Sequence, residues 1–175
     1  MQCLTTTECT DWLDAHGMGG FSPKTGPEDP IDGELLFAAP KEARTQANLA
    51  RALVNWLGEL DVLLLWITDW PFYKPDEMAI ALGLRKAHGE DRLVIEAPGQ
   101  VFSLHEQDEL IGWVHLLMSY GWDGHLYPFP FCGALFQTSH EDILWAFTSG
   151  VERLRTCREI VDSYQLEVHR ESRRC

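Results

Sequence analysis

Residues 60–71 read LDVLLLWITDWP, and this stretch decides the fold. Six consecutive apolar residues, Val62 to Ile67, leave no polar face, so a strand built from them must be covered on both sides. The stretch therefore predicts a central strand at 61–68. It ends at Asp69-Trp70-Pro71, followed by Phe72-Tyr73. The ends of buried strands are where open sheets usually present a binding surface.

Helical and extended segments alternate on both sides of this strand. The predicted helices before the last third of the chain cover 5–16, 41–57, 75–89 and 103–120, and the predicted strands cover 34–39, 61–68 and 93–97. If the strands at 34–39 and 61–68 pair, they form a right-handed parallel crossover. The Gly- and Pro-rich loop at 17–33 is either a lid over a site or an ordinary connector.

The helix predicted at 75–89 has an apolar stripe on one side. Met78, Leu82 and Arg85 share that side, and Ile80 and Leu84 broaden the stripe.

The last third of the chain predicts further strands and one helix. Pro128 and Pro130 make 121–131 an edge or irregular strand, because proline cannot donate to a ladder. A better strand follows at 133–138. Residues 139–148 form either a helix capped at Ser139 or, as the alternation at 143–148 favours, a hairpin. A helix is predicted at 151–165, and 166–175 is expected to be a frayed tail.

These elements predict one domain over residues 1–175, of the α/β or α+β class, with a mixed β-sheet flanked by helices. The chain has 175 residues and is 45% hydrophobic, which suits a single packed core. Its longest apolar run is far shorter than the ~20 residues that cross a membrane. Five scattered cysteines and no secretory signal predict a cytoplasmic protein. No cofactor is predicted, because no glycine-rich phosphate-binding motif occurs.

The net charge of −13 is unevenly distributed. No Lys or Arg occurs between Arg92 and Arg153, and the acids in this interval are Glu96, Glu106, Asp108, Glu109, Asp123, Glu141, Asp142 and Glu152. Such a stretch makes a negative field that disfavours nucleic acid and favours a basic protein surface or a cation. The alternative is that the charge serves solubility alone.

One stretch resembles a metal-binding helix. His105 and Glu109 are one helical turn apart, and with His125 or His140 they could hold a metal ion. The alternative is that the carboxylates at the start of this helix complement its dipole.

The other group of interest combines carboxylates with aromatic side chains, which can supply charge complementarity and rigid anchors in a protein interface. For each aromatic residue the alternative is core packing. The residues predicted to bind a partner are Asp69, Trp70, Phe72, Tyr73, Asp123, His125, Tyr127, Glu141 and Asp142.

Two short motifs carry a resemblance to a known class of protein. Gly121-Trp122-Asp123, with the later Ser139-His140-Glu141-Asp142 turn, resembles motifs of small bacterial immunity-type proteins that neutralise polymorphic toxins. The resemblance implies a cytosolic inhibitor that binds a toxin domain. The first functional hypothesis is thus a non-enzymatic acidic protein that binds a basic toxin or effector domain. The alternatives are a metal-assisted hydrolase and a structural subunit of a cytosolic complex.

Overall fold

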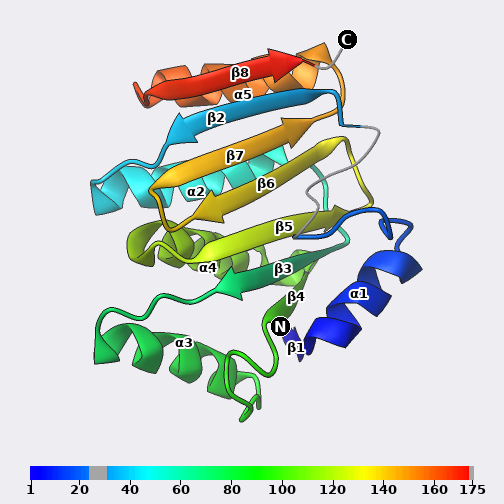
Figure 1. Ribbon diagram of the computed structural model, residues 1–175, viewed down its shortest axis with the longest axis vertical. Helices are drawn as coiled ribbons and strands as arrows, with labels where there is room; N and C mark the ends of the chain where they lie inside the picture. Colours follow the sequence, from blue (N-terminus) through cyan, green and yellow to red (C-terminus); the bar gives the residue numbers. More distant parts are fainter. Residues whose placement is uncertain (24–30, 174–175) are drawn as a thin grey trace.

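The computed structural model of the protein describes residues 1–23 and 31–173 (Figure 1). Residues 24–30 of the loop predicted at 17–33 as a lid or connector lie outside the described residues. Among the described residues, no helix combines the length and apolar composition needed to cross a membrane. The elements, in chain order, are β1 (Gln2–Leu4), α1 (Thr6–Ala15), β2 (Gly33–Ala38), α2 (Ala43–Trp56), β3 (Val62–Asp69), α3 (Pro75–Ala87), β4 (Gly99–Ser103), the 3-10 turn η1 (Leu104–Glu106), α4 (Gln107–Tyr120), β5 (Asp123–Phe129), β6 (Ala134–Ser139), β7 (Ile143–Thr148), α5 (Val151–Ser163) and β8 (Val168–Arg173).

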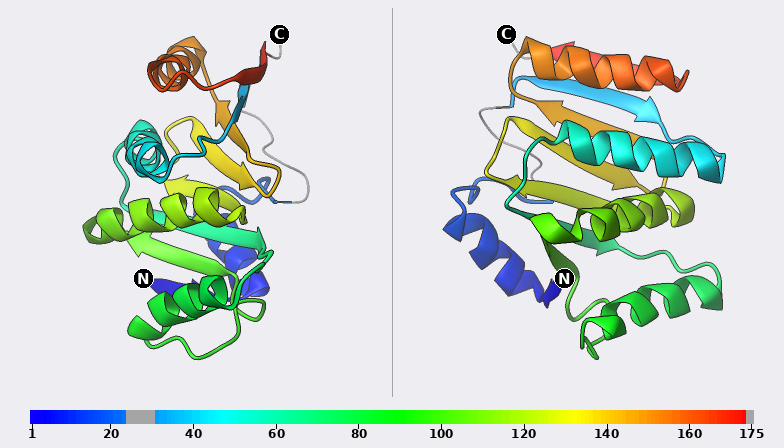
Figure 2. Two further views of the ribbon diagram at one scale, coloured as in Figure 1. Left: turned by 90° about the vertical axis from the view of Figure 1, so that its left-hand side faces the viewer. Right: turned by 180° about the vertical axis from the view of Figure 1, so that it is seen from behind.

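The described strands form one sheet in the order β1-β4-β3-β5-β6-β7-β2-β8, and each pair of neighbours is antiparallel. Helices α2, α4 and α5 cover one face of this sheet, and α1 lies on the other (Figure 2). The α+β class is therefore confirmed. The expected mixed sheet differs from this finding, because among the described strands parallel ones are never neighbours.

Strand β3 is the central strand that its apolar run predicts. Leu63, Leu65 and Ile67 pack into the core beneath the helices, whereas Leu64 and Trp66 pack into the core beneath α1. The strand pairs with β4 on one side and β5 on the other. Covering on both faces explains why no polar residue interrupts it.

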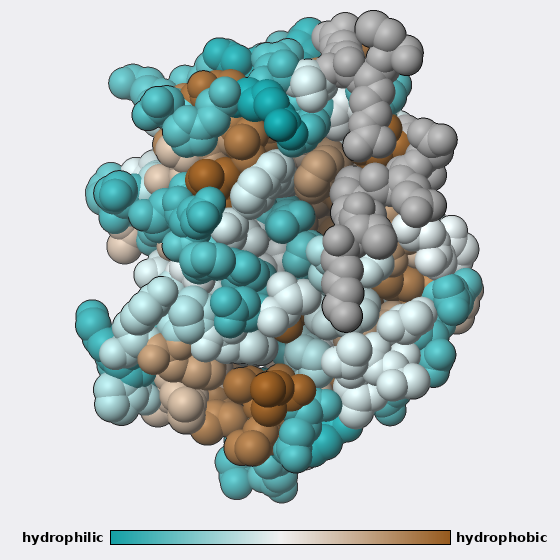
Figure 3. All heavy atoms as spheres, viewed as in Figure 1, coloured by the Kyte–Doolittle hydropathy of each residue, from teal (hydrophilic) through white to brown (hydrophobic). Residues whose placement is uncertain are grey.

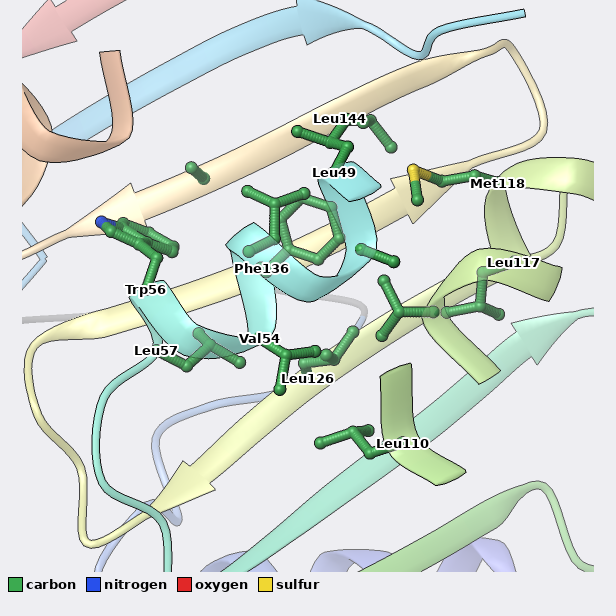
Figure 4. Packing of buried hydrophobic residues seen from close by; sticks show 14 of the residues in the cluster. Leu49, Val54, Trp56, Leu57, Leu110, Leu117, Met118, Leu126, Phe136 and Leu144 are labelled. Atoms are coloured by element: carbon green, nitrogen blue, oxygen red, sulfur yellow. The ribbon is translucent and has the colours of Figure 1, made fainter. Parts of the chain in front are cut away.

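The larger core lies between the sheet and helices α2 and α4 (Figure 4). Val54 of α2 points toward Leu126 of β5, and Leu57, which follows α2, lies beside Val54. Leu117 of α4 packs at the side of this group. These side chains are essentially inaccessible to solvent. The apolar stripes of α2 and α4 thus form one continuous layer on the sheet.

The predicted crossover between β2 and β3 is only partly right. The two strands run in the same direction and are linked through α2, but β5, β6 and β7 lie between them. The β6–β7 hairpin, with its turn at 140–142, confirms the interpretation favoured for 139–148.

Two strand predictions are wrong in position. Residues 93–97 form a turn, and the strand is β4, whose Gly99 and Phe102 pair with Trp66 and Leu63. Strand β5 is interior rather than an edge. Pro128 is accommodated because the ladder to β6 ends at Leu126, so no neighbour on that side requires an N–H at this residue. Pro130 lies beyond the end of β5.

The expectation of a frayed tail is wrong for Val168–Arg173, which form the edge strand β8 against β2. Arg170 contacts the carboxylate of Glu34, and the hydroxyl of Ser172 donates to the same carboxylate. Val168 also packs against the larger core. These contacts explain why a charged segment is ordered.

Candidate functional site

Three separate segments bring polar side chains together at one end of the sheet. Asp69 ends β3, Asp123 begins β5, and the register of these two strands places the two residues opposite each other. The turn between β6 and β7 adds His140, Glu141 and Asp142. We call this group, Asp69, Asp123, His140, Glu141 and Asp142, the acidic strand end; it lies at the left edge of the sheet in Figure 1.

Asp123 is the centre of the acidic strand end. The backbone N–H of His140 donates to its Oδ1 at 2.6 Å, and Nδ1 of His140 lies 3.0 Å from both of its carboxylate oxygens. The hydrogen bond and charge of Asp123 raise the pKa of His140, and the charges of Asp69 and Glu141 act in the same direction. The imidazole is thus held in its protonated form to higher pH than an ordinary histidine.

A buried hydroxyl fixes the start of β5 beside this group. The N–H of Gly124 donates to Oγ1 of Thr138 at 3.0 Å, and that hydroxyl donates to the carbonyl of Trp122 at 2.7 Å. Thr138 is almost completely buried. This pair of hydrogen bonds joins β5 to β6 and sets the position of Asp123.

Asp69, Asp123 and His140 also have the composition of a cation site. One possible ligand atom from each lies within 4.8 Å of the others. Nδ1 of His140 is already paired with Asp123, however, and a proton shared between them accounts for the geometry without a metal ion.

The residues of the metal-site hypothesis do not come together. Glu109 contacts Nε2 of His88 at 2.7 Å in a second described cluster, His88, Glu106 and Glu109. His105 is exposed in η1 and belongs to neither of these clusters.

Two residues predicted to bind a partner lie in the core instead. His125 and Tyr127 are buried on the face of the sheet that α1 covers, with their rings stacked 6.3 Å apart. Burial lowers the pKa of His125 to about 4 and raises the pKa of Tyr127. Both side chains therefore belong to the core beneath α1 and are separate from the acidic strand end.

The aromatic residues after β3 divide between core and surface. Trp70 and Phe72 are half-buried and contact Trp122, with ring centroids 5.0 and 5.6 Å from it. Trp122 itself is completely buried. Tyr73 is 73% exposed, which makes it the aromatic side chain of the predicted set that a partner can reach.

The acids between Arg92 and Arg153 do not form one surface, so the expectation of a single basic-free face is wrong. Glu106, Asp108 and Glu109 lie at the start of α4, whose 14 residues place them about 20 Å along the helix from Asp123. Some of the eight are also paired: Asp108 with Arg51 at 3.5 Å and Glu152 with Arg155 at 2.7 Å. The acidic surface is consequently smaller than the sequence predicts.

Within the acidic strand end, cationic partners are few. Among the described residues, the ion pairs at this group are His140 with Asp123 and Lys41 with Asp142, the latter at 3.7 Å between two largely exposed side chains. Glu141 is exposed and has no ion-pair partner in the described part of the chain. Two of the four carboxylates, those of Asp69 and Glu141, are therefore left for an external group.

A cleft of about 460 Å³ lies between α1 and the end of β3. Trp66, Thr68 and Trp70 line one side, and Thr10 and Ile95 line others. No histidine, cysteine or carboxylate is among its described lining residues. The described lining of the cleft is therefore mainly apolar and supplies no acid–base group.

The sequence missed one member of the site and one surface. His140 was expected only as a metal ligand, although its place in the Ser139–Asp142 turn was a usable signal. The exposed apolar surface near α3 was not predicted, because Met78 and Ile80 were identified only as part of an apolar stripe. Comparison with known proteins gives no match to a protein-family model, to a curated protein sequence or to a solved structure.

Proposed function

We propose that this protein is a non-enzymatic binding protein whose acidic strand end receives a basic surface of another protein. The observation that carries the proposal is the convergence of four carboxylates from three segments, two of which have no ion-pair partner among the described residues. The four are Asp69, Asp123, Glu141 and Asp142. Carboxylates that lie unpaired at the ends of strands in a rigid sheet accelerate encounter with a cationic partner. Exposed Tyr73, four residues beyond Asp69, supplies an aromatic anchor for the same contact.

The proposed partner is a basic toxin or effector domain, which this protein would neutralise in the cytoplasm. The support is that the motifs resembling immunity-type proteins, 121–123 and 139–142, are the residues that build most of the acidic strand end. A recognition motif on an exposed loop between rigid strands suits a binding role. An inhibitor of this kind needs a complementary surface and no catalytic group of its own.

The test compares binding by the wild-type chain with binding by Asp69→Asn/Asp123→Asn/Glu141→Gln. The wild-type chain serves as bait in a lysate at low salt, and the captured protein is then purified for stopped-flow kinetics. We expect a basic partner whose association rate falls with added salt and falls roughly tenfold or more in the triple variant. The matched control is Asp11→Asn/Glu159→Gln/Glu167→Gln, which removes the same charge at exposed positions elsewhere.

The control variant is expected to bind at close to the wild-type rate. Equal association rates for the wild-type chain and the triple variant at low salt would show that the acidic strand end is not part of the interface. Capture of an acidic or neutral partner with no salt dependence would contradict the proposed class of partner.

A further inference from the structure

Helix α3 is oriented opposite to its hydrophobic pattern. Its buried residues are Glu77, Ala81 and Arg85, whereas Met78 and Ile80 are 44% and 36% exposed. Burying charged side chains while exposing apolar ones costs free energy on both counts. The helix also makes few contacts with the other elements. Hydrogen bonds within the chain offset part of this cost: Glu77 accepts from the N–H of Tyr73, and Arg85 donates to the carbonyls of Arg92 and Leu93. They leave Met78 and Ile80 exposed.

An apolar surface surrounds this helix. Four of the seven large hydrophobic side chains exposed in the described residues lie on α3 or in the segment that follows it, and we call them the α3 patch: Met78, Ile80, Leu93 and Ile95. Figure 3 shows apolar atoms gathered over α3 and the turn that follows it, at the bottom of the molecule. Exposed apolar side chains gathered in this way mark an interaction surface.

The charge around the α3 patch differs from the charge of the rest of the chain. Residues 74–92 contain four basic residues and four acidic ones, in a chain with a net charge of −13. A second copy of the chain carries the same negative charge and is repelled by most of the surface. A charge-balanced apolar face is where two copies can approach, whereas a basic partner would be attracted to the acidic strand end instead.

The order of charges along α3 is self-complementary. Asp76 lies in the first turn and Lys86 in the last turn, and both are exposed. When two α3 helices pack antiparallel, Asp76 of each copy faces Lys86 of the other, and Ala79 faces Gly83. The present partner of Lys86 is the exposed Asp91, at 3.0 Å, and such a surface pair exchanges at little cost.

The centre of the exposed face suits close helix packing. A Cβ atom added at Gly83 would meet nothing within 4 Å, so the space beside this residue is open. Small residues at the crossing point let two helix backbones approach, while Met78 and Ile80 on either side supply apolar contact area. We propose that α3 packs antiparallel against α3 of a second copy, giving a two-fold symmetric dimer with the α3 patch at its interface.

This inference does not rest on the proposed function. Its test is sedimentation velocity over a wide concentration range, in which the wild-type chain is expected to be a dimer. Asp76→Lys and Lys86→Asp are each expected to weaken self-association roughly tenfold, because each places like charges opposite one another in both symmetric pairs. An equimolar mixture of the two variants restores both opposite-charge pairs and is expected to dimerise as the wild-type chain does.

Ile80→Glu should give a monomer, whereas Val151→Glu, an equally apolar-to-acidic change at a 52% exposed position outside the patch, should leave the dimer intact. Circular dichroism melting curves check that each variant is folded. A wild-type chain that stays monomeric at the highest concentration overturns the proposal, as does a dimer that Ile80→Glu leaves unchanged. A mixture of the two charge variants that fails to associate overturns the antiparallel arrangement. If the chain is a monomer and a different protein binds it through Ile80, that protein rather than a second copy covers the α3 patch, and the proposal is overturned.

Discussion

The imidazole of His140 lies against Asp123, with Nδ1 3.0 Å from each of the two carboxylate oxygens. The two residues are 17 positions apart in the chain and meet because β5 and β6 are neighbours. Asp123→Asn removes the charge that stabilises the imidazolium and should lower the pKa of His140 toward its ordinary value. The measurement is a titration of the His140 ring protons by NMR, with Asp11→Asn as the control.

The same pair predicts a direction for the pH dependence of stability. The pKa of His140 is higher in the folded than in the unfolded chain, so its contribution is complete below the unfolded value and is lost as pH rises through the folded one. A His140 pKa that Asp123→Asn leaves unchanged would contradict this ion pair. Stoichiometric zinc binding, seen as a shift of the His140 ring signals, would show that the cluster holds a metal ion instead.

His125 predicts the opposite pH dependence. Burial lowers its pKa from 6.5 to about 4, so the unfolded chain binds a proton at this residue more readily than the folded one. Its contribution is complete above the unfolded pKa and is lost as pH falls from 6.5 toward about 4, by about 3 kcal/mol in total. In His125→Gln, urea denaturation should show a shallower loss of stability over that range. Parallel curves for the wild type and the variant would contradict a buried neutral imidazole.

Thr138 and Thr148 form a matched pair of buried hydroxyls. Oγ1 of Thr138 makes two hydrogen bonds, whereas Oγ1 of Thr148 has no hydrogen-bond partner among the described atoms. Thr138→Val leaves the N–H of Gly124 without its acceptor and should cost about 1–3 kcal/mol of unfolding free energy. Thr148→Val should be neutral or stabilising, because it removes an unsatisfied hydroxyl. Equal losses in the two variants, measured by urea denaturation, would contradict this assignment of the Thr138 bonds.

Local pattern was sufficient to predict most elements of the fold. The apolar run of β3, the capping boxes at Thr5 and Ser103 and the alternation in β7 act through neighbours within a few residues, and the predicted elements form there. Strand order depends instead on which apolar faces match across the sheet. For this reason the sequence left open whether β2 and β3 pair, and in the structure β5, β6 and β7 lie between them.

The candidate site was predicted residue by residue but not as a group. Asp69 and Asp123 were each expected to bind, yet their proximity follows from the register of β3 against β5, which the sequence does not specify locally. His125 was misplaced for the same reason, since its alternation partner Gly124 takes the face beneath the helices. For α3, periodicity identifies an apolar stripe but not what covers it, and Met78 and Ile80 of that stripe are exposed.

Strand β8 forms one edge of the sheet, and its removal tests whether it pairs with β2 in solution. Ending the chain at Gln165 removes Leu166 and Val168 from the larger core and leaves β2 as an unpaired edge. From the lost apolar burial alone, the unfolding free energy should fall by about 2–4 kcal/mol. Hydrogen exchange should also accelerate at the β2 amides that face β8, and the exposed edge should promote aggregation.

The matched control is Glu34→Gln, which weakens the contact with Arg170 but keeps β8 in place. Because Arg170 is largely exposed, this change should cost less than about 1 kcal/mol. If the shortened chain keeps the wild-type stability and its β2 amides exchange at the wild-type rate, β8 does not pair with β2 in solution. Loss of stability in the shortened chain but not in Glu34→Gln would assign the effect to strand pairing and apolar burial rather than to the ion pair.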